Sequence, residues 1–191
     1  RGRITEISVS PDGHIWLSTA TGNLYYANDI DADWHSSETD TRKNKEDDAL
    51  RLNSPNFDRV SFFNADTAIL TGYIAYDPTS YHLKSGYYRT TDGGRTWKLL
   101  NLGKDGWIYT VAVNQCGHAW LGTGDKTILY SNDFGLHFKT LKIPHLRSDR
   151  IYAIHMTDSL SGIIGSDDNE ILITNNNWKT ARPIVKTALF K

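Results

Sequence analysis

The stretch that decides the fold of this chain is Thr90-Thr91-Asp92-Gly93-Gly94-Arg95-Thr96-Trp97. Asp92 can accept hydrogen bonds from the backbone N–H groups of the residues that follow it. Gly93 and Gly94 supply positive φ angles without steric cost. Trp97 then starts the next segment with a large apolar surface to bury. The stretch therefore predicts a tight turn between two β-strands.

The same frame recurs later in the chain as Ser131-Asn132-Asp133-Phe134-Gly135-Leu136-His137-Phe138, with Phe in place of Trp. An earlier copy, 27–34, keeps Asp29 and Trp34 but has no Gly. We interpret it as a worn version of the same turn, because the acidic residue and the aromatic residue keep their places.

A fourth copy begins at Thr174 and has Asn176 where the others have Asp. We take Trp178 as its aromatic residue, which makes this copy a shortened turn. Four related turns in one chain indicate a repeat protein, and the repeat has to be identified before the fold is assigned.

Each turn belongs to a repeat of four predicted strands. Apolar residues at the first, fourth and sixth places open each repeat, and each opening segment is expected to be a strand with its apolar side buried. The four triplets are Ile4, Ile7 and Val9; Phe57, Val60 and Phe62; Ile108, Val111 and Val113; and Ile151, Ile154 and Met156. A repeat of four strands at roughly 40–50 residues is typical of β-propeller blades.

The chain is therefore predicted to be an all-β protein, a β-propeller with four recognisable four-stranded antiparallel blades. We expect the blades at about 1–36, 57–103, 107–143 and 150–187. We also expect them to form an arc or a piece of a larger propeller, because closed rings usually need more blades. A compact four-bladed ring is the alternative.

Two segments interrupt the repeat. Residues 37–56 form a polar, charged insertion between the first two blades, which predicts a long solvated loop. Residues 73–85 lengthen the connection between the second and third strands of blade two. In an antiparallel blade these two kinds of connection lie on the face opposite the turns. We expect any binding site on that face, since loop insertions on one side of a repeat protein often mark it.

The second insertion contains an aromatic and polar group made of Tyr73, Tyr76, Tyr81 and His82. These side chains could stack on sugars or grip a peptide, since tyrosine combines apolar area with a hydrogen-bonding tip. The alternative is that the segment packs on itself. Arg147 lies in an inter-blade loop of the same face and is a further candidate ligand-binding residue, with solvated surface charge as its alternative role.

Composition narrows the class of protein and of partner. Hydrophobic residues at 39% and charged residues at 23% describe a soluble globular chain, and a net charge of −1 gives no reason to expect nucleic acid as a partner. No apolar run approaches the roughly 20 residues of a membrane span. The absence of Met at Arg1 is interpreted as a processed or excised N-terminus, and Cys116, the single cysteine, leaves the compartment open.

No metal or cofactor is predicted. The seven histidines show no zinc spacing, and no phosphate-cradling loop or Gly-x-Ser-x-Gly motif is present. Asp29, Asp31 and Asp33 have the spacing of a Ca²⁺ loop, but Trp34 stands where that loop needs Gly for its sharp turn. A worn turn is the better interpretation, and calcium is kept as a minor alternative.

The pattern Ser/Thr-x-Asp-x-Gly-x-Thr-Trp resembles the Asp-box, or BNR repeat, of sialidase-like β-propellers. This family includes sialidases, xyloglucan-type endoglucanases, sortilin-like receptors and assembly factors that resemble the photosystem II stability protein. The resemblance implies that the Asp-box residues have structural roles. They are Thr90, Asp92, Gly94, Thr96, Trp97, Ser131, Asp133, Gly135 and Phe138.

The short blades and the stretch 90–97 look most like the photosystem-factor-like group, which is noncatalytic. The resemblance then implies a binding or assembly scaffold for a protein, peptide or glycan ligand, with an exported location favoured. A relative or fragment of a sialidase or glycoside hydrolase is the alternative. Against it, the sialidase Arg-Ile-Pro motif is absent, and one short propeller cannot form the two-propeller cleft in which the endoglucanases place paired carboxylates.

Overall fold

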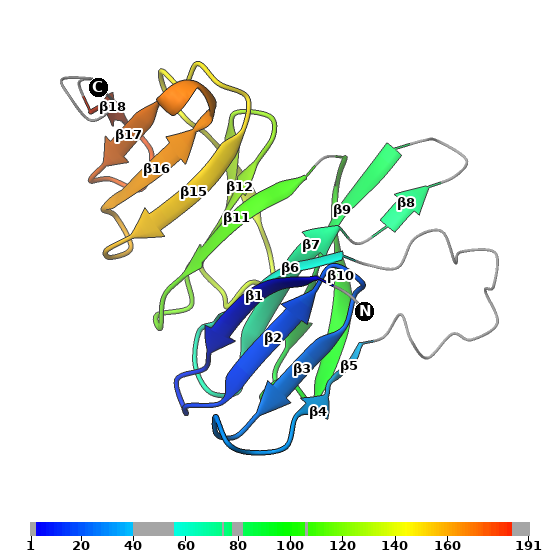
Figure 1. Ribbon diagram of the computed structural model, residues 1–191. Helices are drawn as coiled ribbons and strands as arrows, with labels where there is room; N and C mark the ends of the chain where they lie inside the picture. Colours follow the sequence, from blue (N-terminus) through cyan, green and yellow to red (C-terminus); the bar gives the residue numbers. More distant parts are fainter. Residues whose placement is uncertain (1–2, 40–55, 74, 78–81, 106, 185–191) are drawn as a thin grey trace.

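The computed structural model describes residues 3–39, 56–73, 75–77, 82–105 and 107–184. These residues are nearly all β: their strands form four antiparallel sheets in chain order, and one short 3-10 helix spans Asp167–Asn169. The sheets are arranged as the four blades of a β-propeller (Figure 1). This confirms the fold class predicted from the repeat.

Each blade runs from an inner strand to an outer strand, and neighbours along the chain pair with each other. Blade one contains β1 (Ile4–Val9), β2 (Ile15–Thr19), β3 (Leu24–Ala27) and β4 (His35–Ser36). Blade two contains β6 (Asn56–Phe62), β7 (Ala68–Tyr73), β9 (His82–Thr90) and β10 (Thr96–Asp105), with β8 (Ala75–Asp77) paired to β9. Blade three contains β11 (Ile108–Val113), β12 (Ala119–Thr123), β13 (Thr127–Ser131) and β14 (Lys139–Lys142). Blade four contains β15 (Ile151–Met156), β16 (Gly162–Ser166), β17 (Ile171–Thr174) and β18 (Arg182–Pro183).

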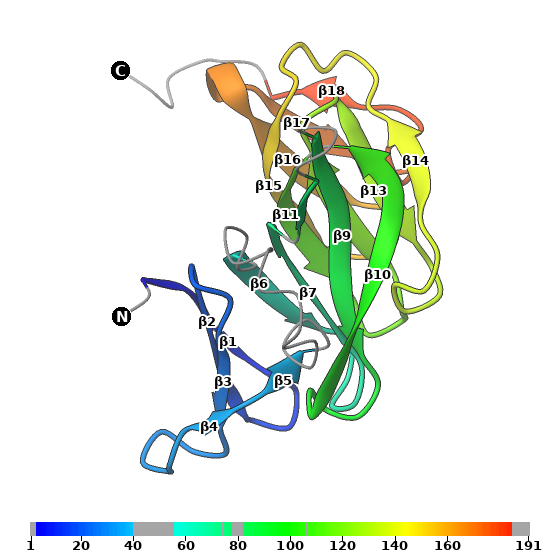
Figure 2. The same ribbon diagram turned by 90° about the vertical axis from the view of Figure 1, so that its right-hand side faces the viewer.

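The start of the predicted insertion 37–56 is not a loop. Residues Glu38–Thr39 form β5, which pairs in parallel with β10 at the outer edge of blade two (Figure 2). Ser37, just before β5, is buried and donates a hydrogen bond to the carbonyl oxygen of Gly94 at 2.6 Å. The chain leaving blade one is therefore fastened to the turn of blade two, while residues 40–55 lie outside the described residues.

A β-bulge explains the uneven spacing of the opening triplets. In every blade the pairing of the first two strands shifts register directly after the first residue of the triplet. One extra residue at that point lets the first and fourth places face the same side of the sheet. Phe57 and Val60 are accordingly both buried in one apolar cluster.

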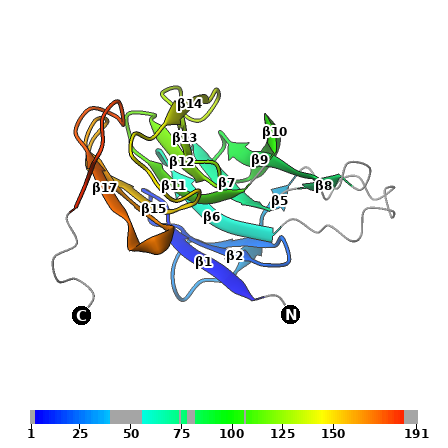
Figure 3. The ribbon, with the colours of Figure 1, turned by 90° about the horizontal axis from the view of Figure 1, so that it is seen from above.

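The apolar core lies between the blades. β1 and β2 pack on β6, β6 and β7 pack on β11, and β11 and β12 pack on β15, so the sheets follow one another in chain order (Figure 3). One buried cluster joins the first three blades and a second joins blades three and four. Each sheet thus gains its buried surface from its neighbours rather than from within itself.

The expectation that every opening strand buries its apolar side is wrong for blade one. Ile4, Ile7 and Val9 are 52%, 63% and 64% exposed. In blades two to four the equivalent residues face the preceding blade. Among the described residues nothing precedes blade one, so its apolar row faces solvent.

No helix in the described part of the chain has the length and apolar character needed to cross a membrane.

Candidate binding surface on the loop face

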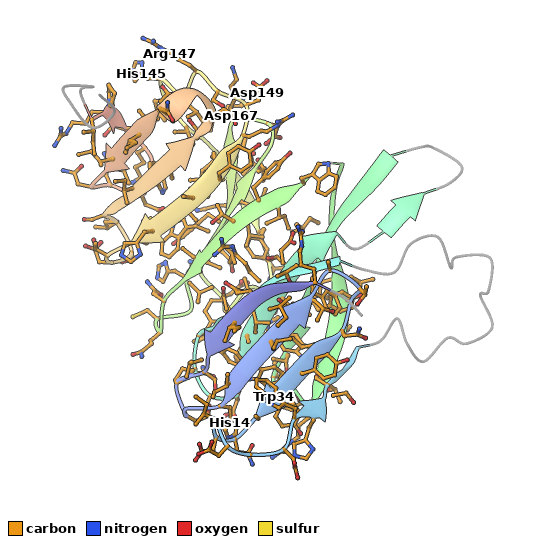
Figure 4. The ribbon with its side chains drawn as sticks, viewed as in Figure 1. His14, Trp34, His145, Arg147, Asp149 and Asp167 are labelled. Atoms are coloured by element: carbon orange, nitrogen blue, oxygen red, sulfur yellow. The ribbon has the colours of Figure 1, made fainter. Side chains whose placement is uncertain are left out.

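Antiparallel pairing divides the connections of the blades between two faces. The turn face carries the connections between first and second strands and between third and fourth strands. The loop face carries the connections between blades and between second and third strands. His14 and Trp34 lie on the turn face, and Arg147 and Asp167 lie at the opposite end of the molecule (Figure 4).

The 90–97 turn is closed by its own polar side chains. The Thr90 hydroxyl donates to the Asp92 carboxylate at 2.7 Å and accepts from the Gly94 N–H at 2.9 Å. Asp92 also accepts from the N–H of Thr96 at 3.0 Å and from its hydroxyl at 2.6 Å. Partial burial acts to raise the pKa of Asp92, but these hydrogen bonds outweigh it and the pKa lies below its ordinary value. The acidic side chain is thus engaged within the turn.

Gly94 also lets two blades approach each other. Its φ is +82°, and a Cβ atom added there would lie 2.2 Å from Cη2 of Trp16 in blade one. The indole of Trp97, which is 1% exposed, donates to the Gly94 carbonyl oxygen and to the Ser37 hydroxyl, each at 3.0 Å. The turn therefore packs blade two onto blade one.

The 131–138 turn repeats this geometry. Ser131 donates to Asp133 at 2.7 Å and accepts from the Gly135 N–H at 3.1 Å. Asp133 also accepts from the N–H of His137 at 3.0 Å, and its other carboxylate oxygen lies 2.7 Å from Nδ1 of that residue. Partial burial acts to raise the pKa of Asp133, but the bonds from His137 and Ser131 prevail and lower it to about 2. Phe138 packs edge-on against Tyr87, with ring centroids 5.2 Å apart.

The interpretation of the fourth turn as shortened is wrong. The N–H of Trp178 donates to the Thr174 hydroxyl at 3.0 Å, and the N–H of Thr180 donates to Asn176 Oδ1 at 2.9 Å. The turn therefore has full length, with Trp178 at the place of Gly and with a φ of +64°. The sequence is misleading here because Trp178 occupies the place of Gly, where the backbone is left-handed, and can be mistaken for the aromatic residue that normally ends the turn.

The 27–34 turn lacks this closed set of bonds. Asp29 Oδ1 accepts a hydrogen bond from the N–H of Asp31, but this bond is long at 3.4 Å. Across the described residues, no three His, Cys, Asp or Glu side chains gather in a way that could hold a metal ion. The calcium alternative for this turn therefore gains no support from the geometry.

The predicted aromatic group is divided among three strands of blade two. Tyr73 ends β7, Tyr76 lies in β8 and His82 starts β9, while Tyr81 lies outside the described residues. β8 pairs with β9, with Asp77 opposite His82, and this hairpin extends away from the rest of the blade (Figure 1). β8 and the start of β9 thus form a hairpin on the loop face.

A further aromatic row, outside the predicted set, lies at the starts of the inner strands of blades three and four. We define it as Trp107, Tyr109 and Tyr152. The Trp107 and Tyr109 rings are stacked with centroids 6.5 Å apart, and Tyr109 meets Tyr152 edge-on at 5.1 Å. Trp107 and Tyr152 are each 44% exposed. A signal was present in the sequence, because Tyr109 and Tyr152 both directly follow the first residue of an opening triplet.

A charged cleft of about 480 Å³ adjoins the row at Tyr109. Its other lining residues come from the starts of blades one and two: Arg3, Ile4, Thr5, Glu6, Asp58 and Arg59. Glu6 accepts a hydrogen bond from the N–H of Val60 at 2.9 Å and forms an ion pair with Arg59 at 3.5 Å. Burial raises the pKa of both Glu6 and Asp58 above the ordinary value. The cleft thus places two carboxyl groups and two arginines beside an exposed aromatic surface.

Arg150 extends the aromatic row. Its guanidinium Nη1 donates to the Tyr152 hydroxyl at 3.3 Å, and this bond, with the nearby tyrosines, raises the pKa of the exposed arginine. Arg147 is held differently: its backbone N–H donates to the Glu170 carboxylate at 3.0 Å while its side chain remains exposed. Among the described residues, Arg150 and not the predicted Arg147 is therefore the arginine that contacts the aromatic row through a hydrogen bond.

Comparisons with known proteins support the fold. No protein-family model and no curated protein sequence matches this chain. Among solved structures, YCF48 from Cyanidioschyzon merolae is similar over 100% of this chain and 58% of its own, with a TM-score of 0.67 and 18% identity. The GH74 enzyme of Niastella koreensis matches over 97% of this chain, with a TM-score of 0.72 and 16% identity. The GH74 xyloglucanase of Xanthomonas campestris also matches over 97% of this chain, with a TM-score of 0.65 and 15% identity.

These likenesses establish the fold alone, because all three identities are low. The chain spans 58% of the YCF48 chain and 30% of each GH74 chain. Together with the blades and their shared turns, they define this chain as a member of the β-propeller class.

Proposed function

We propose that this chain is a noncatalytic binding module that recognises a protein or peptide segment on its loop face. The observation that carries the proposal is the aromatic row with Arg150 at its end. Trp, Tyr and Arg are the residue types most enriched at interface hot spots. Trp107 and Tyr152 present about as much exposed surface as any large aromatic side chain in the described part of the chain.

The turns support the choice of face. We propose that the 90–97, 131–138 and 174–180 turns are Asp-boxes, because in all three the hydroxyl and the Asp or Asn side chain accept hydrogen bonds from the backbone N–H groups at the same places of the turn. The polar side chains of these three turns form their hydrogen bonds within the turn. Few of them are therefore available to bind a ligand on the turn face. The loop face carries the cleft, the aromatic row and the extended hairpin.

The predicted residues Tyr73, Tyr76, Tyr81, His82 and Arg147 remain part of this proposal as the outer margin of the surface. Tyr73, Tyr76 and His82 belong to the hairpin of blade two, which leaves the blade on the same face. A ligand held by the aromatic row would then extend toward the hairpin in an elongated conformation, as a peptide segment or a linear glycan does.

The first test uses random-sequence peptide libraries. Peptides selected on the full chain should bind a Trp107→Ala, Tyr152→Ala double variant at least about 30-fold more weakly, since losing an aromatic anchor costs about 2 kcal/mol or more. Trp34→Ala is the matched control, because Trp34 is 45% exposed but lies on the turn face. Equal loss of affinity in the control and in the double variant would refute the assignment of the face.

The second test separates the hairpin from the row. Replacing 75–83 by an Asn-Gly turn removes β8 and its partner segment while leaving most of β9 paired in the blade. We expect a nearly unchanged melting temperature, because β8 pairs only with the start of β9 and lies outside the four-stranded pairing of the blade. Reduced affinity would include the hairpin in the surface, whereas unchanged affinity would restrict the surface to the aromatic row.

One observation favours glycoside hydrolysis as a second candidate function. Glu6 and Asp58 line the same cleft with raised pKa values, and glycosidases use a pair of carboxyl groups of which one has a raised pKa. Glu6, however, is already engaged by Val60 and Arg59, which gives it a role in joining blades one and two.

A screen with fluorogenic glycosides and xyloglucan oligosaccharides decides between the two functions. The binding proposal predicts no turnover above the buffer rate. Turnover that is abolished by Glu6→Gln or by Asp58→Asn, with each variant still folded, would establish the hydrolase function instead.

A further inference from the structure

The residue that follows the first place of each opening triplet has the same position in all four blades. These second-place residues are Thr5, Asp58, Tyr109 and Tyr152. In every blade the pairing of the first two strands shifts register at this residue, so each of the four is the extra residue of a β-bulge. A bulge changes the direction of the side chain that it carries. The repeat therefore gives these four side chains one common geometry.

The second-place residues form one surface around the charged cleft. Thr5, Asp58 and Tyr109 all line this cleft of about 480 Å³, and Tyr109 meets Tyr152 edge-on at 5.1 Å. The volume is in the range of sites that hold a small ligand or a single side chain. The first places of the triplets are apolar in every blade, whereas the second places differ in chemistry. The repeat alone therefore does not account for the residues of the cleft.

Asp58 is the charged residue of this set, and no described residue donates a hydrogen bond to its carboxylate. Burial raises the pKa of Asp58 above its ordinary value, and the charges of Arg59 and Arg3 act against burial without overcoming it. The opposite holds for Asp92 and Asp133, whose hydrogen bonds in the turns lower their pKa values. The Asp58 carboxylate therefore keeps the capacity to accept hydrogen bonds from a positively charged group in the cleft.

Glu6, the second carboxyl group of the cleft, points to the same sign of ligand charge. Arg59 Nη1 lies 3.5 Å from Glu6 Oε1, and the N–H of Val60 donates to Glu6 Oε2 at 2.9 Å. Burial still raises the pKa of Glu6 above its ordinary value. Both carboxyl groups are thus incompletely compensated although two arginines line the cleft. A bound anion would increase this imbalance, whereas a bound cation would reduce it.

The Tyr109 ring provides an aromatic wall for such a cation. Its ring stacks with Trp107 at 6.5 Å, and Tyr152 contacts it from another strand. A Cβ atom added at Gly124 would lie 3.1 Å from Cε2 of Tyr109, so glycine at this place leaves room for the ring. The face of an aromatic ring attracts a cation. A carboxylate and an aromatic ring in one cleft together suit an ammonium or guanidinium group.

We propose that the cleft binds the basic side chain of a lysine or arginine in the peptide ligand, with Asp58 as its counterion and Tyr109 as its wall. The proposal rests on the proposed recognition of a peptide on the loop face, and it names the residue that this peptide carries. The basic side chain enters the cleft, while the adjoining residues of the peptide lie on the exposed rings of Trp107 and Tyr152.

Substituted peptides measure the contribution of the positive charge. Peptides are selected from a random library on the full 191-residue chain and are then synthesised with an acetylated N-terminus and an amidated C-terminus, so that their ends carry no charge. They should share a Lys or Arg at one position. Replacing Lys by norleucine, or Arg by citrulline, keeps the length of the side chain and removes its charge. We expect the affinity to fall by about 10-fold or more, because a charge-assisted hydrogen bond is lost.

The Asp58→Asn variant tests the counterion. It should bind the charged peptide and its neutral counterpart equally well. Its stability separates a binding role from a structural role. Because the folded pKa of Asp58 is raised, the stability that this group contributes at low pH is lost as pH rises through that pKa. The variant should therefore be at least as stable as the wild type at pH 7, as measured by urea unfolding.

Asp149→Asn is the matched control. Asp149 lies on the same face, its side chain is 72% exposed, and it forms an ion pair with Lys126 at 3.2 Å outside the cleft. The control should keep the wild-type preference for the charged peptide. Charge reversal by Asp58→Lys should in turn favour peptides in which the basic residue is replaced by Glu.

Four results would overturn the proposal. Selected peptides without a common basic residue, whose binding is nevertheless lost in the Trp107→Ala, Tyr152→Ala double variant, would refute the cation site and leave the proposed function intact. A selection that yields no binding peptide would refute both. A charge preference that persists in Asp58→Asn would place the cation elsewhere. Equal loss of the preference in Asp149→Asn would reduce it to a general attraction by the acidic residues of this face.

Discussion

At the scale of single residues, Gly94 shows why the repeat requires glycine at one place in its turn. An alanine there would adopt a left-handed φ, which costs about 1–2 kcal/mol, and would also clash with the Trp16 ring. Overpacking adds about 1–3 kcal/mol, so we expect Gly94→Ala to lower the free energy of unfolding by roughly 3 kcal/mol. Urea unfolding followed by tryptophan fluorescence measures the loss.

Gly13→Ala is the matched control for this variant. Gly13 has a φ of +90°, but a Cβ atom added there would meet nothing within 4 Å. The control should therefore lose about 1–2 kcal/mol from backbone strain alone. Equal losses at Gly13 and Gly94 would contradict a close contact between the turn of blade two and Trp16.

Asp133 makes the stability of its turn depend on pH. Its folded pKa of about 2 lies below its ordinary value of 3.8, so its charge stabilises the fold above the ordinary value and this contribution is lost as pH falls toward 2. Asp133→Asn removes the charge yet keeps an acceptor, as Asn176 does in the fourth turn. Because the Asp133 side chain is 39% exposed, solvent screens its interactions, and we expect a difference of about 1 kcal/mol or less.

The measurement is the free energy of unfolding of wild type and Asp133→Asn at a series of pH values. The wild type should be the more stable protein near pH 6, and the two curves should converge on acidification below about pH 4. A difference that stays constant from pH 6 to pH 2 would show that the charge of Asp133 contributes nothing to the fold.

At the scale of structural elements, the fourth turn shows how one frame accommodates a different residue. The left-handed φ of Trp178 costs about 1–2 kcal/mol, and glycine at this place would remove that cost. The Trp178→Gly change would also leave a cavity where the buried indole packs. Removing a buried Trp typically costs about 3–5 kcal/mol, so we expect a net loss of roughly 2–3 kcal/mol in the free energy of unfolding.

Thermal and urea unfolding of this variant test that balance. Asn175→Gly, in the same turn, is a control for added backbone flexibility without loss of the buried ring. A Trp178→Gly protein as stable as the wild type would mean that the indole adds no net packing energy between blades three and four.

The sequence allowed the blades to be predicted because the repeat itself is periodic. Spacing alone located the opening strands, although the β-bulge that produces their first-and-fourth pattern became visible in the pairing. β5 could not be predicted, since a two-residue strand carries no periodic signal and depends on the edge that β10 offers. The length of the turn in blade four could not be predicted, because Trp178 is the type of residue expected at the end of the turn but occupies the place of Gly.

At the scale of the whole molecule, strand counting correctly separated the two faces, but the side chains of the candidate site could not be found that way. Trp107, Tyr109 and Tyr152 are apart in the sequence, and each alone has the appearance of an ordinary strand residue. Stacking of blade three on blade four brings their rings together. The exposed ends of blades one and four are likewise properties of the arrangement, because the same triplets are buried in the other blades.

Recognition on the loop face is the central claim, and hydrogen exchange followed by mass spectrometry tests it most directly. A peptide selected from a random library on the full chain is added at saturating concentration, and protection is compared with the free protein. The claim predicts slower exchange at 107–110 and 150–153, with the 90–97 and 131–138 turns unchanged. Protection confined to those two turns, with no change around Tyr109 and Tyr152, would contradict it.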